Sequence, residues 1–299
     1  MPGSPSRGLW RGFILACQLV IVLTMIVDAH THIFPPQVLA HRHAFLEGEP
    51  AFAAIYASPK AHMLDGPGLL AAMDKDGVDI SWALGFPWVQ EEHACLHNDY
   101  LLQAVADSGG RLRGLGCVHP PAGWALPEAR RCLQMGLSGL GELAFYDSDL
   151  DLNSLAPLCQ LCAQADRPLL LHTNEPVGHR YPGKSPMNLT TLYQLIRDHG
   201  RTKLVLAHMG GGIFLYSLLK REVNQSLQNV WLDTAAGPFL YGPRAYALAV
   251  ELMGPGKLLL GSDHPLLPVS RYQQELEQAG LVPEDLKQIL GLTALDLIP

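Results

Sequence analysis

The feature that most constrains the fold is a repeated alternation between short apolar runs and longer amphipathic stretches, which begins at residue 26. Several of the apolar runs are hydrophobic throughout, which is typical of parallel strands buried on both faces. The stretches between them repeat apolar residues at helical spacing. The predicted strands are Ile26–Asp28, Val78–Leu84, Leu112–Val118, Leu137–Leu143, Pro168–Leu171, Lys203–Ala207, Val230–Asp233 and Leu258–Gly261.

Helical periodicity fills most of the intervals, and Gly and Pro residues follow several of the predicted strands. The clearest helices are predicted at Glu91–Ala106, Leu126–Met135, Leu152–Ala165, Leu189–Asp198 and Arg244–Leu252. Eight strands with intervening helices over about 270 residues predict an α/β fold, a single-domain (β/α)8 TIM barrel. A doubly wound open sheet is the alternative, but no Gly-x-Gly-x-x-Gly sequence follows the first strand.

The first 24 residues differ from the rest of the chain. Arg7 and Arg11 precede the apolar stretch Phe13–Thr24, as in the first two regions of a signal peptide, but no clear small-x-small cleavage site follows. The stretch is shorter than the ~20 apolar residues of a membrane helix. Met25 lies directly before the first strand. We therefore expect residues 1–24 to be an N-terminal extension, disordered or an apolar helix, and residues 25–299 to form the barrel.

Charge and cysteine content narrow the partners. The 299 residues are 48% hydrophobic and 16% charged, with a net charge of −7 and no dense run of Lys or Arg. This argues against a nucleic acid or an anionic membrane as the main partner. The six scattered cysteines, including a lone Cys159-x-x-Cys162 on a predicted helix, favour reduced thiols. We expect a cytoplasmic protein with a small-molecule substrate, which could form a homo-oligomer.

Metal-capable side chains end several of the predicted strands. His30 and His32 follow the first apolar run at positions i and i+2, so they lie on the same face of a strand. Further candidates end strands four, five, six and eight, and in a barrel all of these positions meet at one rim. Imidazole and carboxylate ligands suit Zn, Mn or Fe. The candidate metal ligands are His30, His32, Glu142, His172, His208 and Asp263.

A metal at this rim would lower the pKa of a bound water toward ~7 and make hydroxide available at neutral pH. An adjacent carboxylate can accept the water's proton and pass it to a leaving group. Asp263, in Gly261-Ser-Asp263-His-Pro265, is the best candidate for this catalytic role.

Several of these motifs resemble the amidohydrolase superfamily, and specifically its amidohydrolase-related branch of metal-dependent TIM-barrel hydrolases and decarboxylases. The resemblance spans residues 26–298 and rests on Asp28-Ala-His30-Thr-His32, on His172, on Leu206-Ala-His208-Met-Gly-Gly-Gly and on Gly261-Ser-Asp263-His-Pro265. It implies that His30, His32, His172 and Asp263 bind a catalytic metal. His208 would then polarise or deprotonate the bound water, or orient the substrate.

Glu142 leaves the number of ions open. Gly141-Glu142 is similar to a strand-four sequence in relatives with two metals, where the carboxylate bridges both ions. In that arrangement His172 and His208 would hold the second ion. Otherwise Glu142 is an acid of the rim or a partner of a ligand. We expect one or two divalent ions per chain, with Zn favoured and Mn or Fe as alternatives.

The long segment after the fifth strand, residues 173–186, is of the kind that often carries specificity at a barrel mouth. Arg180 and Lys184 could neutralise a substrate carboxylate or phosphate, and Glu175 lies close to His172 in sequence; the alternative is a solvated loop with ordinary surface charges. The main functional expectation is a metal-dependent hydrolase of a small amide, lactone or ester. The alternatives are a non-oxidative decarboxylase of an aromatic or unsaturated acid, and a barrel without activity.

Overall fold

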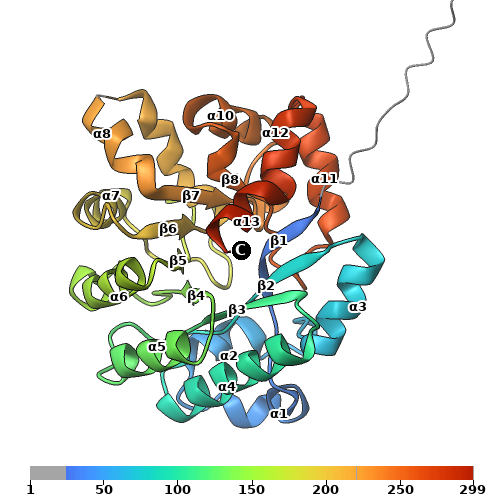
Figure 1. Ribbon diagram of the computed structural model, residues 1–299. Coiled ribbons are helices and arrows are strands. Elements are labelled where there is room, and N and C mark those ends of the chain that lie inside the picture. Colours follow the sequence, from blue (N-terminus) through green and yellow to red (C-terminus); the bar gives the residue numbers. More distant parts are fainter. Residues whose placement is uncertain (1–24, 220, 299) are drawn as a thin grey trace, which may run out of the picture.

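The computed structural model describes residues 25–219 and 221–298, so the predicted N-terminal extension lies outside the described residues. Within them, eight parallel strands pair in chain order, as Figure 1 shows. The backbone N–H of Ala29 donates to Leu260 O and that of Asp263 donates to His30 O, each at 2.8 Å, which joins the last strand region to the first. The strands are β1 Val27–His32, β2 Ile80–Leu84, β3 Leu112–Gly116, β4 Gly139–Leu143, β5 Pro168–Leu171, β6 Lys203–Leu206, β7 Val230–Asp233 and β8 Leu258–Leu259.

Helices surround the strands, and the predicted single-domain TIM barrel is confirmed. The five helices predicted from periodicity are present with ends within one residue of those expected. The α-helices are α1 Pro36–Ala40, α2 Pro50–Tyr56, α3 Gly66–Asp76, α4 Glu91–Asp107, α5 Ala125–Gln134, α6 Leu152–Ala165, α7 Leu189–Asp198, α8 Arg221–Ser226, α9 Gly237–Leu240, α10 Arg244–Met253, α11 Val269–Gln278, α12 Pro283–Lys287 and α13 Thr293–Leu297.

The C-terminal helix α13 lies over one end of the barrel, at the centre of the view in Figure 1. Leu297 and the following Ile298 are buried in one cluster with inward-facing strand residues, among them Trp82 and Leu170. Burying a side chain of this size stabilises the fold by about 1.5–3 kcal/mol. This end is therefore packed with apolar side chains, and chemistry is confined to the other end.

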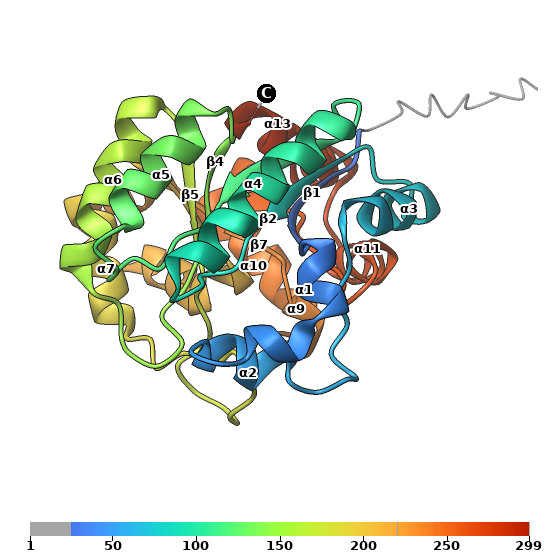
Figure 2. The same ribbon diagram turned by 90° about the horizontal axis from the view of Figure 1, so that it is seen from below.

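The opposite end carries α1 and α2, which Figure 2 shows on the far side of the barrel from α13. Aromatic rings hold these short helices down: Phe34, Phe52, Phe86 and Trp88 form a buried cluster. Phe52 and Trp88 have ring centroids 4.6 Å apart. The helices are too short to be stable alone, so this packing is what fixes them.

A buried carboxylate also holds α2 in place through hydrogen bonds. Glu49, directly before α2 and 1% exposed, accepts hydrogen bonds from the backbone N–H groups of Val89 and Gln90 at 2.7 and 3.0 Å. The ring of His93 donates to the same carboxylate at 2.9 Å. The start of α2 is thereby fixed to the segment that follows β2.

Two further observations bear on sequence expectations. Cys159 and Cys162 are buried residues of α6 and, like the other cysteines of the described residues, form no disulfide. None of the helices in the described part of the chain is long and apolar enough to cross a membrane.

Candidate metal centre

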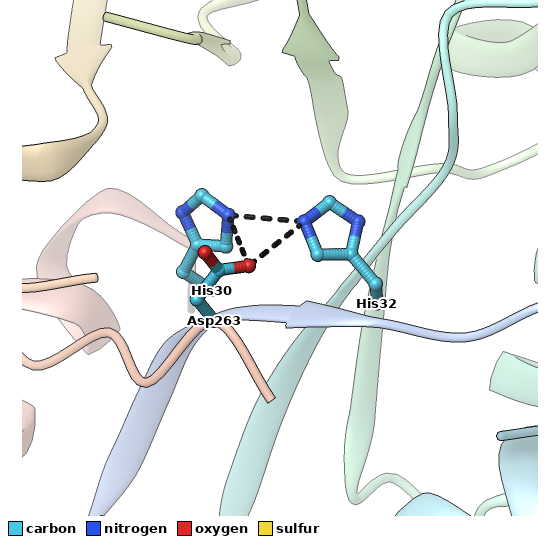
Figure 3. Close-up of side chains that lie close together, drawn as sticks. All are labelled: His30, His32 and Asp263. Atoms are coloured by element: carbon cyan, nitrogen blue, oxygen red, sulfur yellow. Dashed lines mark hydrogen bonds and ion pairs between the residues drawn. The ribbon is translucent and has the colours of Figure 1, made fainter. Parts of the chain in front are cut away.

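His30, His32 and Asp263 form a first cluster at the carboxyl end of the barrel (Figure 3). Their facing atoms are close together: His30 Nε2 and His32 Nε2 are 3.1 Å apart, and Asp263 Oδ1 lies 3.7 and 3.4 Å from them. Both imidazoles come from β1, and Asp263 follows β8. The register of β1 against this segment brings together residues more than 200 positions apart in the chain.

Glu142, His172 and His208 form a second cluster, from β4 and from the ends of β5 and β6. Glu142 Oε1 is 2.9 Å from His172 Nδ1 and 3.4 Å from His208 Nε2, and the two ring nitrogens are 3.2 Å apart. The Gly141–Glu142 peptide bond is cis. All three side chains are buried.

Glu142 lies between the two clusters. Its second oxygen, Oε2, is 3.7 Å from His30 Nε2 and 3.5 Å from His32 Nε2. Burial alone would raise the pKa of this carboxyl, but the charges of His30 and His172 outweigh burial and hold the pKa well below its ordinary value. The carboxylate is therefore ionised and faces four imidazoles.

The spacing of these atoms fits a divalent cation. Metal–ligand bonds of about 2.1 Å at tetrahedral or right angles place neighbouring donor atoms ~3.0–3.4 Å apart. Most of the separations in each cluster lie within a few tenths of an ångström of that range. The donor set of imidazoles and carboxylates suits Zn, Mn or Fe.

The turn after β6 aims His208 into the site. His208 and Met209 have φ angles of 55° and 59°, and Gly210, Gly211 and Gly212 continue in the left-handed region. A Cβ on Gly211 would clash with the backbone oxygen of Asn174, so only glycine fits there. His208 Nδ1 donates to Ala235 O at 3.0 Å, which leaves Nε2 facing Glu142. Burial by itself lowers the pKa of His208, but the hydrogen bond and charge of Glu142 raise it to about 9.

Two further buried acidic side chains, Asp28 and Asp233, lie next to the clusters. Asp28 accepts hydrogen bonds from Ser262, and burial raises its pKa to about 7. Asp233 contacts the ring of His30 at 2.8 Å. The sequence interpretation assigned no role to Asp233, although it ends the seventh apolar run and obeys the same strand-end rule.

The two clusters open into a cavity of about 580 Å³, within the size range of small-molecule sites. Aromatic side chains wall it: Phe86 and Tyr146 are stacked with centroids 6.2 Å apart, and Tyr56 lies 5.9 Å from Phe86. Asp263 and Glu142 are the carboxylates that line this cavity in the described part of the chain.

The loop residues predicted to bind substrate lie differently. Lys184 Nζ donates to Glu175 Oε1 at 2.5 Å, and Tyr181 Oη donates to Glu175 Oε2 at 2.9 Å, so these groups bind one another within the loop. Arg180 is exposed, and none of Glu175, Arg180 and Lys184 is among the residues lining the cavity. Their role in substrate binding stays a prediction. The same loop contributes Tyr181 and His179 to the cavity instead.

The family model described as amidohydrolase matches residues 27–299. The chain belongs to the amidohydrolase family. No curated protein matches it in sequence.

Several solved structures share the fold. The 5-carboxyvanillate decarboxylase from Sphingomonas paucimobilis is 20% identical, with a TM-score of 0.72 over 92% of this chain and 99% of that one. A dihydroxybenzoic acid decarboxylase from Polaromonas sp. JS666, solved with manganese and 2-nitroresorcinol, is 18% identical, with a TM-score of 0.67 over 92% and 97%. The 2,6-dihydroxybenzoate decarboxylase from Rhizobium is 17% identical, with a TM-score of 0.67 over 92% and 98%.

These structures correct the functional expectation from sequence. The expected hydrolysis of an amide, lactone or ester is wrong on this comparison, because these three structurally similar enzymes are decarboxylases. The physical reason for the error is that metal ligands at a barrel rim are common to both reactions, whereas the difference lies in the cavity that surrounds them.

Proposed function

We propose that this amidohydrolase-family protein is a divalent-metal-dependent, non-oxidative decarboxylase of an aromatic or unsaturated carboxylic acid. The observation that carries the proposal is a single cavity whose floor holds histidines and ionised carboxylates and whose walls are aromatic side chains. The decarboxylases that share the fold lend support, and one of them holds manganese.

The walls suit a flat, conjugated substrate. The rings of Phe86 and Tyr146 are nearly parallel, with an interplanar angle of 17°. Tyr146 is also close to the second cluster, since its centroid is 5.1 Å from that of His172. Aromatic pairs contribute about 0.5–1.5 kcal/mol beyond their buried area, so a ring bound here gains orientation as well as affinity.

The mouth of the cavity suits an acid. Its exposed lining residues include Lys60, His62 and His179. Lys60 has no ion-pair partner among the residues that the structure describes, and the carboxylates that line the cavity are Asp263 and Glu142 on its floor. A chain with a net charge of −7 thus presents basic groups where an anionic substrate would enter.

In the proposed site, His30, His32 and Asp263 would hold a cation, with Glu142 facing these three side chains. A divalent ion there would neutralise the anionic oxygens of the substrate. The second cluster has similar donor spacing, so it either holds a second ion or handles protons. Metal analysis of the purified protein separates the two arrangements: two equivalents per chain would indicate that Glu142, His172 and His208 hold a second ion.

The reaction needs one proton at carbon. Loss of CO2 breaks the bond between the carboxyl carbon and the ring, and leaves the electron pair on the ring carbon. His208, with its pKa raised to about 9 by Glu142, carries a proton at neutral pH and lines the cavity. We assign it the donation of that proton to the ring carbon. Asp263, whose pKa is held low by His32 and its neighbours despite burial, stays ionised beside it.

The test is turnover of 2,6-dihydroxybenzoate and 5-carboxyvanillate by the manganese-loaded protein in D2O. We expect release of CO2 and one deuterium at the carbon that carried the carboxyl group, with no oxygen from labelled water in the organic product. His172→Ala, which removes a buried imidazole of the second cluster, should abolish the release. Incorporation of solvent oxygen, or no CO2 from a broad set of hydroxybenzoates, would reject the proposal.

A further inference from the structure

We infer that Asp233 is a positioning residue that fixes the two histidines on either side of the centre, His30 through its ring and His208 through its backbone. Asp233 is the last residue of β7 and is fully buried. It touches neither the cavity nor the cation position, so its action is through these histidines. The inference rests on the proposed metal site for its effect on a cation.

One oxygen of Asp233 sets the proton position on His30. His30 Nδ1 lies 2.8 Å from Asp233 Oδ2. A carboxylate can only accept here, so Nδ1 must carry the hydrogen when the ring is neutral. The lone pair is then on Nε2, the atom that faces His32, Glu142 and Asp263. A partner of this kind typically orients a metal-binding imidazole and raises its basicity.

The other oxygen holds the turn after β6. Asp233 Oδ1 accepts the backbone N–H of His208 at 2.9 Å and that of Ala235 at 3.0 Å. His208 is in the left-handed region, with φ of 55°, which is costly for a residue with a side chain. The bond to Asp233 compensates part of that cost and keeps the His208 ring directed at Glu142.

A single carboxylate therefore couples β7 to histidines from β1 and from the β6 turn. It needs three donors, and the structure supplies them at a position closed to solvent. A buried charge without partners would be costly there, and the three hydrogen bonds together supply the partners of the Asp233 carboxylate.

The decisive variant is Asp233→Asn, which keeps the shape. The amide oxygen can still accept from the two backbone N–H groups, so the amide NH2 points at His30 Nδ1 and reverses that hydrogen bond. His30 should then carry its hydrogen on Nε2, where it blocks the lone pair. We expect the Kd for Mn²⁺ or Zn²⁺ to rise about 10–100-fold. Nitrogen-15 NMR of histidine-labelled, metal-free protein, at a pH where the ring is neutral, reports the tautomer directly.

Thr202→Val is the matched control, because Thr202 is buried and donates a hydrogen bond to Cys159 O from the amino end of β6, away from the centre. It should lower thermal stability and leave cation affinity and the His30 tautomer unchanged. An unchanged His30 tautomer or an unchanged Kd in Asp233→Asn would overturn the inference. If the wild-type protein binds no cation or releases no CO2, the proposed function fails, while the tautomer still decides the role of Asp233.

Discussion

At the scale of single residues, the centre depends on opposite pKa shifts in groups a few ångströms apart. Glu142 and Asp263 are kept ionised by the imidazoles around them, and His208 is kept protonated by Glu142. Burial opposes all three shifts, so each group holds its charge only because its neighbours do. Removing one charge should therefore change the others.

Asp263→Asn tests this dependence. The amide cannot balance the charge of the imidazoles or of a cation, so we expect turnover to fall about 10²–10⁴-fold, with part of the metal retained. Steady-state kinetics at saturating Mn²⁺, with metal content measured on the same sample, checks it. Asp147→Asn removes an exposed carboxylate after β4 and should leave turnover near that of the wild type. Retention of a third of the activity by Asp263→Asn would contradict the prediction.

The strand-end rule predicts which residues gather at the rim, because in a parallel barrel the position along each strand fixes the end at which a side chain emerges. All six candidate ligands lie at the rim, where His30, His32 and Asp263 form one cluster and His172 belongs to the other; their metal-binding roles stay predictions. The rule cannot predict pairing inside a loop. Lys184 is neutralised by Glu175 through contacts that depend on the folded path of residues 175–184, and no periodic pattern in the sequence encodes that path.

At the scale of elements, the long helices follow from apolar periodicity, and Leu152–Ala165 and Leu189–Asp198 are found with the predicted bounds. The short helices α1 and α2 have no such pattern. They are fixed by aromatic packing and by Glu49, contacts that join residues some 40 positions apart. Helix α2 carries Ile55 and Tyr56 to the cavity. An element that the sequence pattern does not predict therefore forms part of the cavity wall.

Glu49→Gln should loosen the part of the cavity wall that α2 forms. A glutamine offers one acceptor oxygen where the carboxylate accepts three hydrogen bonds, and its NH2 would face a donor. Leaving buried donors unpaired costs about 1–3 kcal/mol. We expect a lower melting temperature, and a KM that rises more than kcat falls, because the wall moves while the floor stays.

Glu47→Gln is the matched control for this variant. It makes the same change in charge two residues away on an exposed side chain, and surface changes of this kind stay within about 0.5 kcal/mol. Equal melting temperatures for the Glu49 and Glu47 variants would show that the hydrogen bonds of the Glu49 carboxylate contribute nothing to stability.

At the scale of the whole molecule, the centre ties five strands or strand ends into one charged unit, while α13 seals the other end with apolar side chains. One end of the barrel is thus closed by apolar packing, and the other holds charged groups that balance one another. Without a cation, protons on the histidines balance the carboxylates. With one, the protons on the imidazoles that bind it must leave. Cation binding, proton release and stability are therefore linked.

The linkage predicts a pH dependence with a definite sign. In the metal-free protein the pKa of His208 is raised to about 9, and the pKa of His30 is also raised. The stabilisation from these shifts is full below the ordinary histidine pKa of about 6.5 and is lost as the pH rises through about 9. A cation held by His30 competes with the proton on that ring, so its affinity should rise up to about tenfold per pH unit for each proton displaced. The melting-temperature gain on adding Mn²⁺ should therefore widen from pH 6.5 to 8.5.

Calorimetric titration of Mn²⁺ in two buffers of different ionisation enthalpy measures this directly. At pH 7 we expect at least one proton released per ion bound. His62→Gln, which alters an exposed histidine at the cavity mouth, should leave the proton count unchanged. His208 is the proposed proton donor and keeps its proton when the cation binds, so His208→Gln should also leave the count unchanged. A Kd that stays constant between pH 6.5 and 8.5, with no proton released, would contradict the prediction. It would mean that the histidines that bind the cation are already neutral before it binds, so that their protons do not balance the charges of the carboxylates.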